Sequence, residues 1–176
     1  MPDRVSISVE EIRPQHVVSQ LCCGQPTLDD FLRKYAKAHP RQGLSRTWVV
    51  LKETVVVAYY TLSFASVSHT AATTRVSKGM PRHDLPVLLL ARLAVDQSLQ
   101  GQGLGSVVLE HAMRRCLQMA DAAQAVGAVT LPVRAVLVQA IDAKAAAFYE
   151  KYGFERSPTD PLHLMMLVKD MKKVLG

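Results

Sequence analysis

The hydrophobic positions of this chain change their spacing several times, and each change marks a boundary between expected elements. Residues 85–95 form an almost continuous apolar run, which predicts a buried strand. The glycine-rich segment QGQGLG follows at residues 100–105. After it, apolar residues recur three or four positions apart, as on one helix face, at Leu104, Val108, Ala112, Cys116 and Met119 or Ala120. The pattern predicts a strand, a tight turn and a helix to about residue 126.

The chain before residue 85 predicts further strands. Residues 6–12 alternate between apolar and polar like a short strand, and residues 46–51 and 55–65 predict a hairpin around Lys52-Glu53-Thr54. Residues 66–84 are polar and weakly patterned, so they predict a loop with at most a short helix.

A helix is expected at residues 27–39, with Thr27 as its N-cap and Pro40 after its end. Asp29 and Asp30 would lie in its first turn, where negative charges interact favourably with the helix dipole and stabilise the helix. The expected apolar face consists of Leu28, Phe31, Leu32 and Tyr35.

The C-terminal part predicts another strand and a capped helix. Residues 133–141 form a buried strand, and Asp142 caps a helix over residues 143–152 that Gly153 ends. Residues 163–168 supply a final strand. This alternation of strands and helices predicts an α/β protein with a mixed sheet.

The composition indicates one domain over residues 1–176. The chain has 49% hydrophobic residues and no linker rich in proline, glycine or serine, so it can bury one substantial core. No apolar run approaches the roughly 20 residues that span a bilayer, and the first residues are too polar for a signal peptide. We therefore expect a cytoplasmic protein without a membrane partner.

The cysteines and histidines predict no metal site. The chain lacks CxxC and HExxH patterns, and its six histidines are scattered singly. Cys22, Cys23 and Cys116 form no spaced framework, as is typical of a reducing compartment. No GxSxG segment points to a serine hydrolase.

The formal net charge of +6 favours polyanionic partners. Several cations are candidates to hold nucleic-acid phosphates. They are Arg33, Lys34, Lys37, Arg41, Arg46, Arg75, Lys78, Arg82 and Arg92. The alternative for each of them is an ordinary solvated charge.

The glycine turn predicts a phosphate site. Glycines allow tight curvature, and the first N–H groups of the following helix have no partners within it, so a pyrophosphate can accept from them. An ordinary tight loop is the alternative. A dinucleotide-binding GxGxxG turn fits poorly because the third glycine comes one residue early, and a nucleoside-triphosphate loop is excluded because no Lys-Ser or Lys-Thr follows.

Three segments resemble the GCN5-related N-acetyltransferase (GNAT) family. Gln100-x-x-Gly103-x-Gly105 is similar to its acyl-CoA pyrophosphate motif, residues 145–154 (AAAFYEKYGF) to its A-x-x-F-Y-x-x-x-G-F segment, and residues 91–96 (ARLAVD) to its splayed pantetheine strand. The resemblance implies a mostly antiparallel central sheet flanked by helices and splayed at the acyl-CoA site, with acetyl-CoA as donor. The implied cofactor-binding residues are Leu93, Ala94, Val95, Gln100, Gly101, Gln102, Gly103, Leu104, Gly105 and Ser106.

The N-terminal half resembles the acetyltransferase toxins of type II toxin–antitoxin modules, through Cys23-Gly24, residues 28–32 (LDDFL), residues 34–36 (KYA) and residues 59–63 (YYTLS). That resemblance implies an enzyme that acetylates the amino group of aminoacyl-tRNA and blocks translation. It also implies a homodimer and a ribbon-helix-helix antitoxin as partners.

Tyr149 is the candidate catalytic acid. A phenol with an ordinary pKa of about 10 can protonate the leaving thiolate, and the resemblance places Tyr149 at the family's catalytic tyrosine. The alternative is packing on a helix face with Ala145, Phe148 and Tyr152, and Tyr152 is expected in the core. Neither paired carboxylates nor a His-Asp pair indicate a general base. This agrees with an α-amine as acceptor, because an amine with a pKa near 8 is partly neutral at pH 7 and demands less of the enzyme.

Two other functions stay open at this point. One is a GNAT enzyme that acts on a small amine or a protein amino group. The other is a non-catalytic module that binds CoA or nucleic acid.

Overall fold

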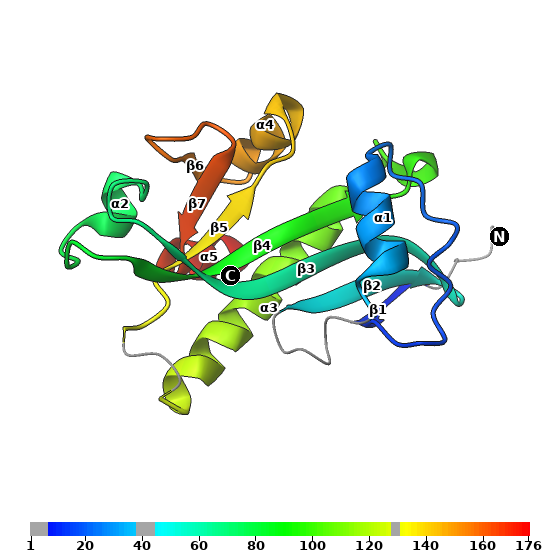
Figure 1. Cartoon of the computed structure of the whole chain (residues 1–176), viewed down its shortest axis with the longest axis horizontal. Helices are drawn as coiled ribbons and strands as arrows, with labels where there is room; N and C mark the ends of the chain where they lie inside the picture. The colour runs from blue at the N-terminus through cyan, green and yellow to red at the C-terminus, as the bar shows by residue number, and fades with distance from the viewer. Residues whose placement is uncertain (1–6, 38–44, 128–130) are drawn as a thin grey trace. The chain divides into compact units, whose positions relative to one another are not determined.

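The computed structural model describes residues 7–37, 45–127 and 131–176 (Figure 1). In chain order its elements are β1 (Ile7–Glu11), α1 (Pro26–Lys34), β2 (Arg46–Lys52), β3 (Val55–Val67), α2 (Thr74–Ser77), β4 (Leu85–Val95), η2 (Gln97–Leu99), α3 (Leu104–Ala125), β5 (Ala135–Gln139), α4 (Ala143–Lys151), β6 (Glu155–Arg156), β7 (His163–Leu167) and α5 (Val168–Leu175). The chain divides into two compact units. Unit 1 is Met1–Leu62 with Arg92–Ala112, and unit 2 is Ser63–Ala91 with Met113–Gly176.

The described strands are hydrogen-bonded in the order β1-β2-β3-β4-β5-β7-β6. β4 and β5 run parallel, whereas β1–β2, β2–β3, β5–β7 and β6–β7 are antiparallel. The expected mixed, mostly antiparallel sheet with flanking helices is therefore confirmed. The parallel register extends from Val87–Ala135 to Leu90–Val138, while β4 itself continues to Val95.

Unit 1 is built on the β1–β2–β3 meander. The predicted hairpin is present, and Lys52 pairs with Val55 as the last residue of β2. Glu53 adopts a φ of 60°, the left-handed conformation of a tight two-residue turn.

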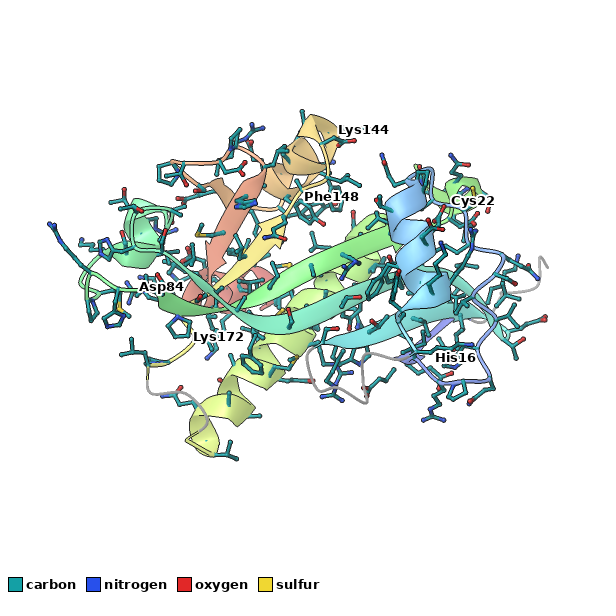
Figure 2. All side chains as sticks on the ribbon, in the orientation of Figure 1. His16, Cys22, Asp84, Lys144, Phe148 and Lys172 are labelled. Carbon is teal, nitrogen blue, oxygen red and sulfur yellow. The ribbon has the colours of Figure 1, made fainter. Side chains whose placement is uncertain are left out.

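A long loop joins β1 to α1, with His16 and Cys22 labelled on it in Figure 2. The buried His16 accepts the Arg13 backbone N–H at Nδ1, and its Nε2 lies 3.1 Å from Glu10 Oε1. Lys37 donates to the backbone carbonyls of Pro14 and His16 at 2.9 and 3.0 Å. These contacts fix the middle of the loop against the end of α1.

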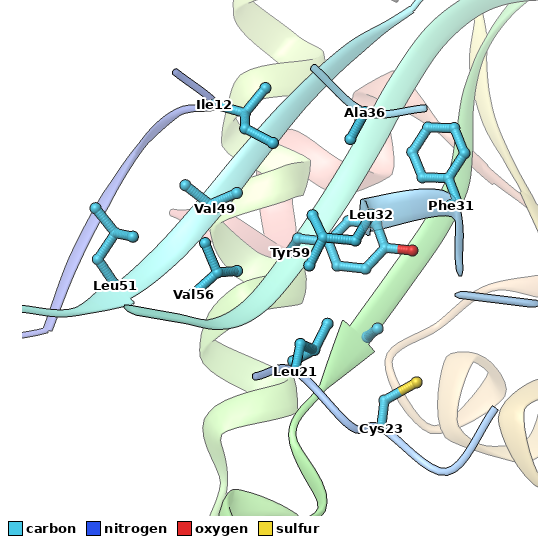
Figure 3. Packing of buried hydrophobic residues seen from close by; sticks show 11 residues of the cluster. Ile12, Leu21, Cys23, Phe31, Leu32, Ala36, Val49, Leu51, Val56 and Tyr59 are labelled. Carbon is cyan, nitrogen blue, oxygen red and sulfur yellow. The ribbon is translucent and has the colours of Figure 1, made fainter. Parts of the chain in front are cut away.

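Two neighbouring tyrosines of β3 place helices on opposite faces of unit 1, because successive side chains on a strand point to opposite faces. Tyr59 donates to the Leu28 carbonyl of α1 at 2.6 Å, and its ring stacks on Phe31 (Figure 3). On the other face, the Tyr60 hydroxyl lies 2.6 Å from His111 Nδ1 in α3. The α1 side forms one core cluster, consisting of Ile12, Leu21, Cys23, Phe31, Leu32, Ala36, Val49, Leu51, Val56, Tyr59 and Ala94.

α1 begins earlier than the sequence analysis expected. It starts at Pro26 with Gln25 as N-cap, so the prediction of Thr27 as N-cap is wrong. Proline suits the first helical position because its fixed φ is already helical and its missing N–H would have no partner there. The Gln25 carbonyl accepts the backbone N–H groups of Leu28 and Asp29.

The end of α1 also differs. The helix ends at Lys34, and Tyr35 follows it with 53% of its surface exposed, so Tyr35 is not part of the buried face. The helix does confirm Asp29 in its first turn, where this carboxylate accepts the Cys23 N–H at 3.0 Å. The expected stop at Pro40 lies outside the described residues.

Unit 2 surrounds β5 and β7. Its core cluster joins the end of β3, the start of β4, β5, β7 and Val76 of the short helix α2. Asp142 caps α4 as predicted, because its carboxylate accepts the Ala145 N–H at 2.8 Å. Gly153 then follows α4 with a φ of 99°, which favours glycine. β6 and α5 are additions that the sequence analysis did not predict.

Candidate functional site

The glycine turn has the geometry of an anion site at a helix start. Gly101 and Gly103 have φ of 77° and 85°, conformations that side chains rarely adopt, and a Cβ at either position would meet nothing within 4 Å. α3 begins at Leu104, and Val107 N–H donates to the Gly103 carbonyl at 3.3 Å. The preceding N–H groups of the first turn point out of the helix start, where an anion can accept from them. Gly105 lies inside this first turn.

Gln100 shapes the turn through its side chain. Its Nε2 donates to the Val95 carbonyl and to the Cys23 carbonyl, both at 2.8 Å. Because the amide nitrogen has both of its N–H groups in these bonds, the side chain joins the end of β4 to the loop before α1. Gln100 therefore positions the turn. The amide of Gln102 folds back in a similar way and donates to the Ser98 carbonyl at 3.1 Å.

A second set of bonds fixes the same loop, and the sequence analysis missed it. Cys22 N–H donates to Asp96 Oδ2 at 3.0 Å, and Gln97 N–H donates to the Cys22 carbonyl at 2.8 Å. Burial acts to raise the pKa of Asp96, but hydrogen bonds from Ser98 and from the Cys22 backbone outweigh it and hold the pKa below its usual range. The local signal was Asp96 followed two residues later by Ser98, a helix-capping pattern that starts η2.

The expected pantetheine strand is the last part of β4. Ala94 and Val95 are buried and Leu93 is half-buried. All three lie beyond Leu90, the last β4 residue in the register with β5. This stretch of β4 is therefore available to pair with an extended ligand, as the predicted splay requires.

Most of the candidate phosphate-binding cations of unit 1 already have partners. Arg33 donates to the Leu21 carbonyl at 2.6 Å, and Lys37 holds the β1–α1 loop as described. Lys34 pairs with Asp30 at 3.7 Å. Arg46 forms a two-pronged ion pair with Glu11 at 3.0 and 2.7 Å. Arg41 lies outside the described residues.

Arg92 differs from these cations. Its guanidinium carbon lies 3.6 Å from the centre of the Phe31 ring, a close cation–π contact. Burial lowers the pKa of Arg92 from its usual value, while nearby Tyr59 acts in the opposite direction. Within the part of the chain that the structure describes, no carboxylate pairs with it.

In unit 2, Arg75 pairs with Asp170 and Glu155. Lys78 and Arg82 are exposed on and after the end of α2, and their side chains have no ion pair among residues 7–37, 45–127 and 131–176. Of the three candidate cations in unit 2, these two therefore remain available for an external phosphate.

Tyr149 is the buried tyrosine of α4. Only 6% of its surface is exposed, and its ring makes edge contacts with Phe148 and Phe154 at centroid distances of 5.3 and 5.8 Å. Burial raises its pKa above the ordinary value of a phenol, so it stays protonated at neutral pH. Tyr152, expected in the core, is half-buried and contacts Phe148.

The described residues contain neither a membrane-spanning helix nor a cluster of metal ligands. In that part of the chain no helix is long and apolar enough to cross a membrane. It also contains no group of three or more histidine, cysteine, aspartate and glutamate side chains arranged to hold a metal ion.

Comparisons with known proteins decide the family. The model of the acetyltransferase (GNAT) domain matches residues 43–156. A tRNA-acetylating toxin of Mycobacterium tuberculosis (strain ATCC 25618 / H37Rv) is 46% identical over 159 residues, which cover 90% of each chain. The chain belongs to the GNAT acetyltransferase family. The predicted resemblance is thus confirmed, and the chain is an acetyltransferase by family.

Solved structures of GNAT toxins share the fold. A tyrosine-to-phenylalanine variant of KacT has a TM-score of 0.83 at 26% identity, covering 96% of this chain and 98% of that chain. AtaT complexed with acetyl-methionyl-tRNAfMet has a TM-score of 0.83 at 25% identity, covering 97% and 100%. A tyrosine-to-phenylalanine variant of AtaT, bound to the C-terminus of the antitoxin AtaR and to acetyl-CoA, has a TM-score of 0.78 at 25% identity, covering 97% and 98%.

Proposed function

We propose that this protein is an acetyl-CoA-dependent N-acetyltransferase that acetylates the amino group of aminoacyl-tRNA and so blocks translation. The observation that carries the proposal is the 46% identity, over 90% of both chains, with a tRNA-acetylating toxin. We treat Met1–Gly176 as one domain, because the family model covers parts of both compact units.

The glycine turn fits the acyl donor. The open space above Gly101 and Gly103, which a Cβ would fill, lets phosphate oxygens approach the backbone at the start of α3. The residues assigned to the donor's phosphates are Gly101, Gln102, Gly103, Leu104, Gly105 and Ser106, all through their backbone. Gln100 and Asp96 act indirectly by fixing the turn and the loop against it.

The end of β4 is assigned to the reacting group. Acetyl-CoA supplies the acetyl group as a thioester that an amine can attack. Leu93, Ala94 and Val95 would hold the pantetheine as an added strand, and one of their N–H groups would stabilise the negative charge that develops on the thioester oxygen.

Tyr149 is assigned as the general acid. Its hydroxyl would give a proton to the sulfur when the carbon–sulfur bond breaks, while the attacking amine forms the amide bond and loses its proton to water. A phenol is protonated at neutral pH, and burial, which raises the pKa of Tyr149, extends this protonated state to higher pH. Tyrosine-to-phenylalanine variants of KacT and of AtaT have been solved.

The acceptor is assigned from three features. An α-amino group with a pKa near 8 is partly neutral at pH 7 and so needs little help from a base. The net charge of +6 favours a polyanion, and the candidate cations Lys78, Arg82 and Arg92 form no ion pair with a carboxylate in the described ranges. AtaT, a relative in fold, has been solved with acetyl-methionyl-tRNAfMet. Charged tRNA would be acetylated in the cytoplasm, where it is used.

The partners follow from the same relatives. AtaT has been solved with the C-terminus of its antitoxin AtaR, and a KacTA complex has been solved with DNA. We propose that this protein is held inactive by an antitoxin of the ribbon-helix-helix type and acts as a homodimer.

The test is a comparison of acceptors at fixed acetyl-CoA. Initial rates are measured with charged tRNA, deacylated tRNA, a small primary amine and a peptide amino terminus. We expect kcat/KM for charged tRNA to exceed that of every other acceptor by about a hundredfold or more, a margin of about 2.7 kcal/mol. Equal or higher values for the small amine or the peptide would replace the proposal with a GNAT enzyme of that substrate class.

A further inference from the structure

Arg92 projects from β4 onto a fixed aromatic platform in unit 1. Its guanidinium lies over Phe31, whose surface is 4% exposed. Phe31 stacks on Tyr59 at a centroid distance of 6.2 Å (Figure 3). The Tyr59 hydroxyl donates to the Leu28 carbonyl. Phe31 and Tyr59 are both buried, so the aromatic surface below the guanidinium is held in place.

The N–H donors of this guanidinium form no hydrogen bond with the residues that the structure describes. Arg46 provides the comparison, since it also lies over an aromatic ring, that of Trp48, at 5.1 Å. The nitrogen atoms of Arg46 are occupied by both carboxylate oxygens of Glu11. Arg92 has no such bond within the described ranges, and the residue is half-buried. The Arg92 guanidinium is a planar fork of five N–H donors, and no carboxylate of the described residues occupies it. Such a fork suits two oxygens of one phosphate.

The position of Arg92 indicates which phosphate it meets. Arg92 directly precedes Leu93, Ala94 and Val95, which the proposed function assigns to the thioester. It shares one face of β4 with Ala94, whose side chain belongs to the core cluster beside α1. The donor's pyrophosphate is assigned to the backbone of the glycine turn, at least nine residues further along the chain. Near the thioester, the anion that an aminoacyl-tRNA brings is the phosphodiester before its terminal nucleotide.

We propose that Arg92 is a specificity-determining residue that binds the last phosphodiester of the acceptor RNA, next to the aminoacylated nucleotide. This inference rests on the proposed function. The stacked guanidinium discriminates an RNA-linked amine from a free amine, because only the former carries an anion at a fixed distance from the reacting nitrogen. Lys78 and Arg82, by contrast, are exposed cations that contribute sequence-independent attraction to the rest of the RNA.

The test uses two aminoacylated acceptor-stem RNA duplexes. They are identical except that the last linkage is a phosphodiester in one and a charge-neutral methylphosphonate in the other. We expect the wild-type protein to prefer the phosphodiester by about tenfold to a hundredfold in kcat/KM, the scale of a charge-assisted hydrogen-bonded pair. In Arg92→Met this ratio should fall to about one, with the dissociation constant of acetyl-CoA within twofold of the wild type.

Two variants separate recognition from structure. Arg92→Lys keeps the charge over Phe31 but not the fork, so we expect an intermediate ratio. Arg46→Met removes a stacked arginine whose fork is already occupied by Glu11, so the ratio between the two RNAs should stay at the wild-type value.

Three results would overturn the inference. Equal losses on both RNAs in the Arg92 variants mean that Arg92 only supports the fold. Weaker acetyl-CoA binding with an unchanged ratio means that it holds a phosphate of the donor. If charged tRNA and both duplexes stay unacetylated, the proposed function itself fails, whereas the first two results leave it intact.

Discussion

The side-chain amide of Gln100 bonds the backbone carbonyl of Val95 and, with its second N–H, the carbonyl of Cys23, both at 2.8 Å. One side chain therefore joins three segments: the end of β4, the loop before α1 and the glycine turn. The bonds of Asp96 and Gln97 to Cys22 reinforce the same junction. The turn is thus positioned by polar contacts from outside its own sequence.

We predict that Gln100→Ala weakens acetyl-CoA binding about tenfold and lowers the free energy of unfolding by about 1–3 kcal/mol, because two hydrogen bonds are lost. Calorimetry and denaturant unfolding measure the two effects. Gln102→Ala is the matched control, since the exposed Gln102 amide makes a single bond, to Ser98, and its loss should change little. Wild-type affinity in Gln100→Ala would show that the junction does not position the turn.

We predict that Gly103→Asp reduces acetyl-CoA affinity by more than tenfold. The substitution strains a φ of 85° and adds a negative charge where a pyrophosphate is expected. Gly79→Asp is the control for strain alone, because Gly79 has a φ of 74° and equally open space. If both variants bind acetyl-CoA like the wild type, the donor's phosphates lie elsewhere.

Much of the fold was predictable from local signals. β4 and α3 follow from a continuous apolar run and a helical period, and α4 from the Asp142 cap and Gly153. The local pattern did not predict α5, because half of its eight residues are charged and only Met171 is buried. In α1 both Thr27 and Pro26 indicate a helix start. Thr27 is a suitable N-cap residue, but Pro26 at the first helical position is the signal that the structure follows.

The candidate site was predictable only in part. The glycine turn and the acetyltransferase family could be recognised from contiguous motifs, and the family is confirmed. The bonds of Cys22 to Asp96 and of Gln100 to Cys23 join residues 74 and 77 positions apart, and no periodicity reports such pairs. Periodicity also does not report the ion pair between Arg46 and Glu11. This pair engages Arg46, which the sequence offered as a candidate to hold a phosphate. The roles of Tyr149 and of the phosphate-binding cations stay predictions.

We predict that Tyr149→Phe keeps the fold and acetyl-CoA binding but loses about a hundredfold or more in kcat, the scale of a general acid. Phenylalanine preserves the edge contacts with Phe148 and Phe154 and removes only the hydroxyl. Tyr152→Phe, the same change on a half-buried side chain of the same segment, should stay near the wild-type rate. Equal losses in the two variants would contradict the assignment.

The pH dependence carries a separate prediction. The rate should rise as the acceptor amine loses its proton, around a pKa of about 8. Because burial raises the pKa of Tyr149 above its ordinary value, the phenol stays protonated and able to donate, so kcat/KM should hold a plateau up to a pH of about 10. Initial rates in overlapping buffers measure this. A fall in kcat/KM between pH 8 and 9, in protein that remains folded, would exclude a buried phenol as the acid.

The most direct test of the central claim locates the transferred acetyl group chemically. Labelled acetyl-CoA is incubated with the wild-type protein and either charged or deacylated tRNA, and the tRNA is then treated with mild alkali, which cleaves the aminoacyl ester. We expect all label on the charged tRNA to be released as N-acetyl amino acid, and deacylated tRNA to take up none. Label that stays on the RNA after ester cleavage, or equal labelling of deacylated tRNA, would contradict it.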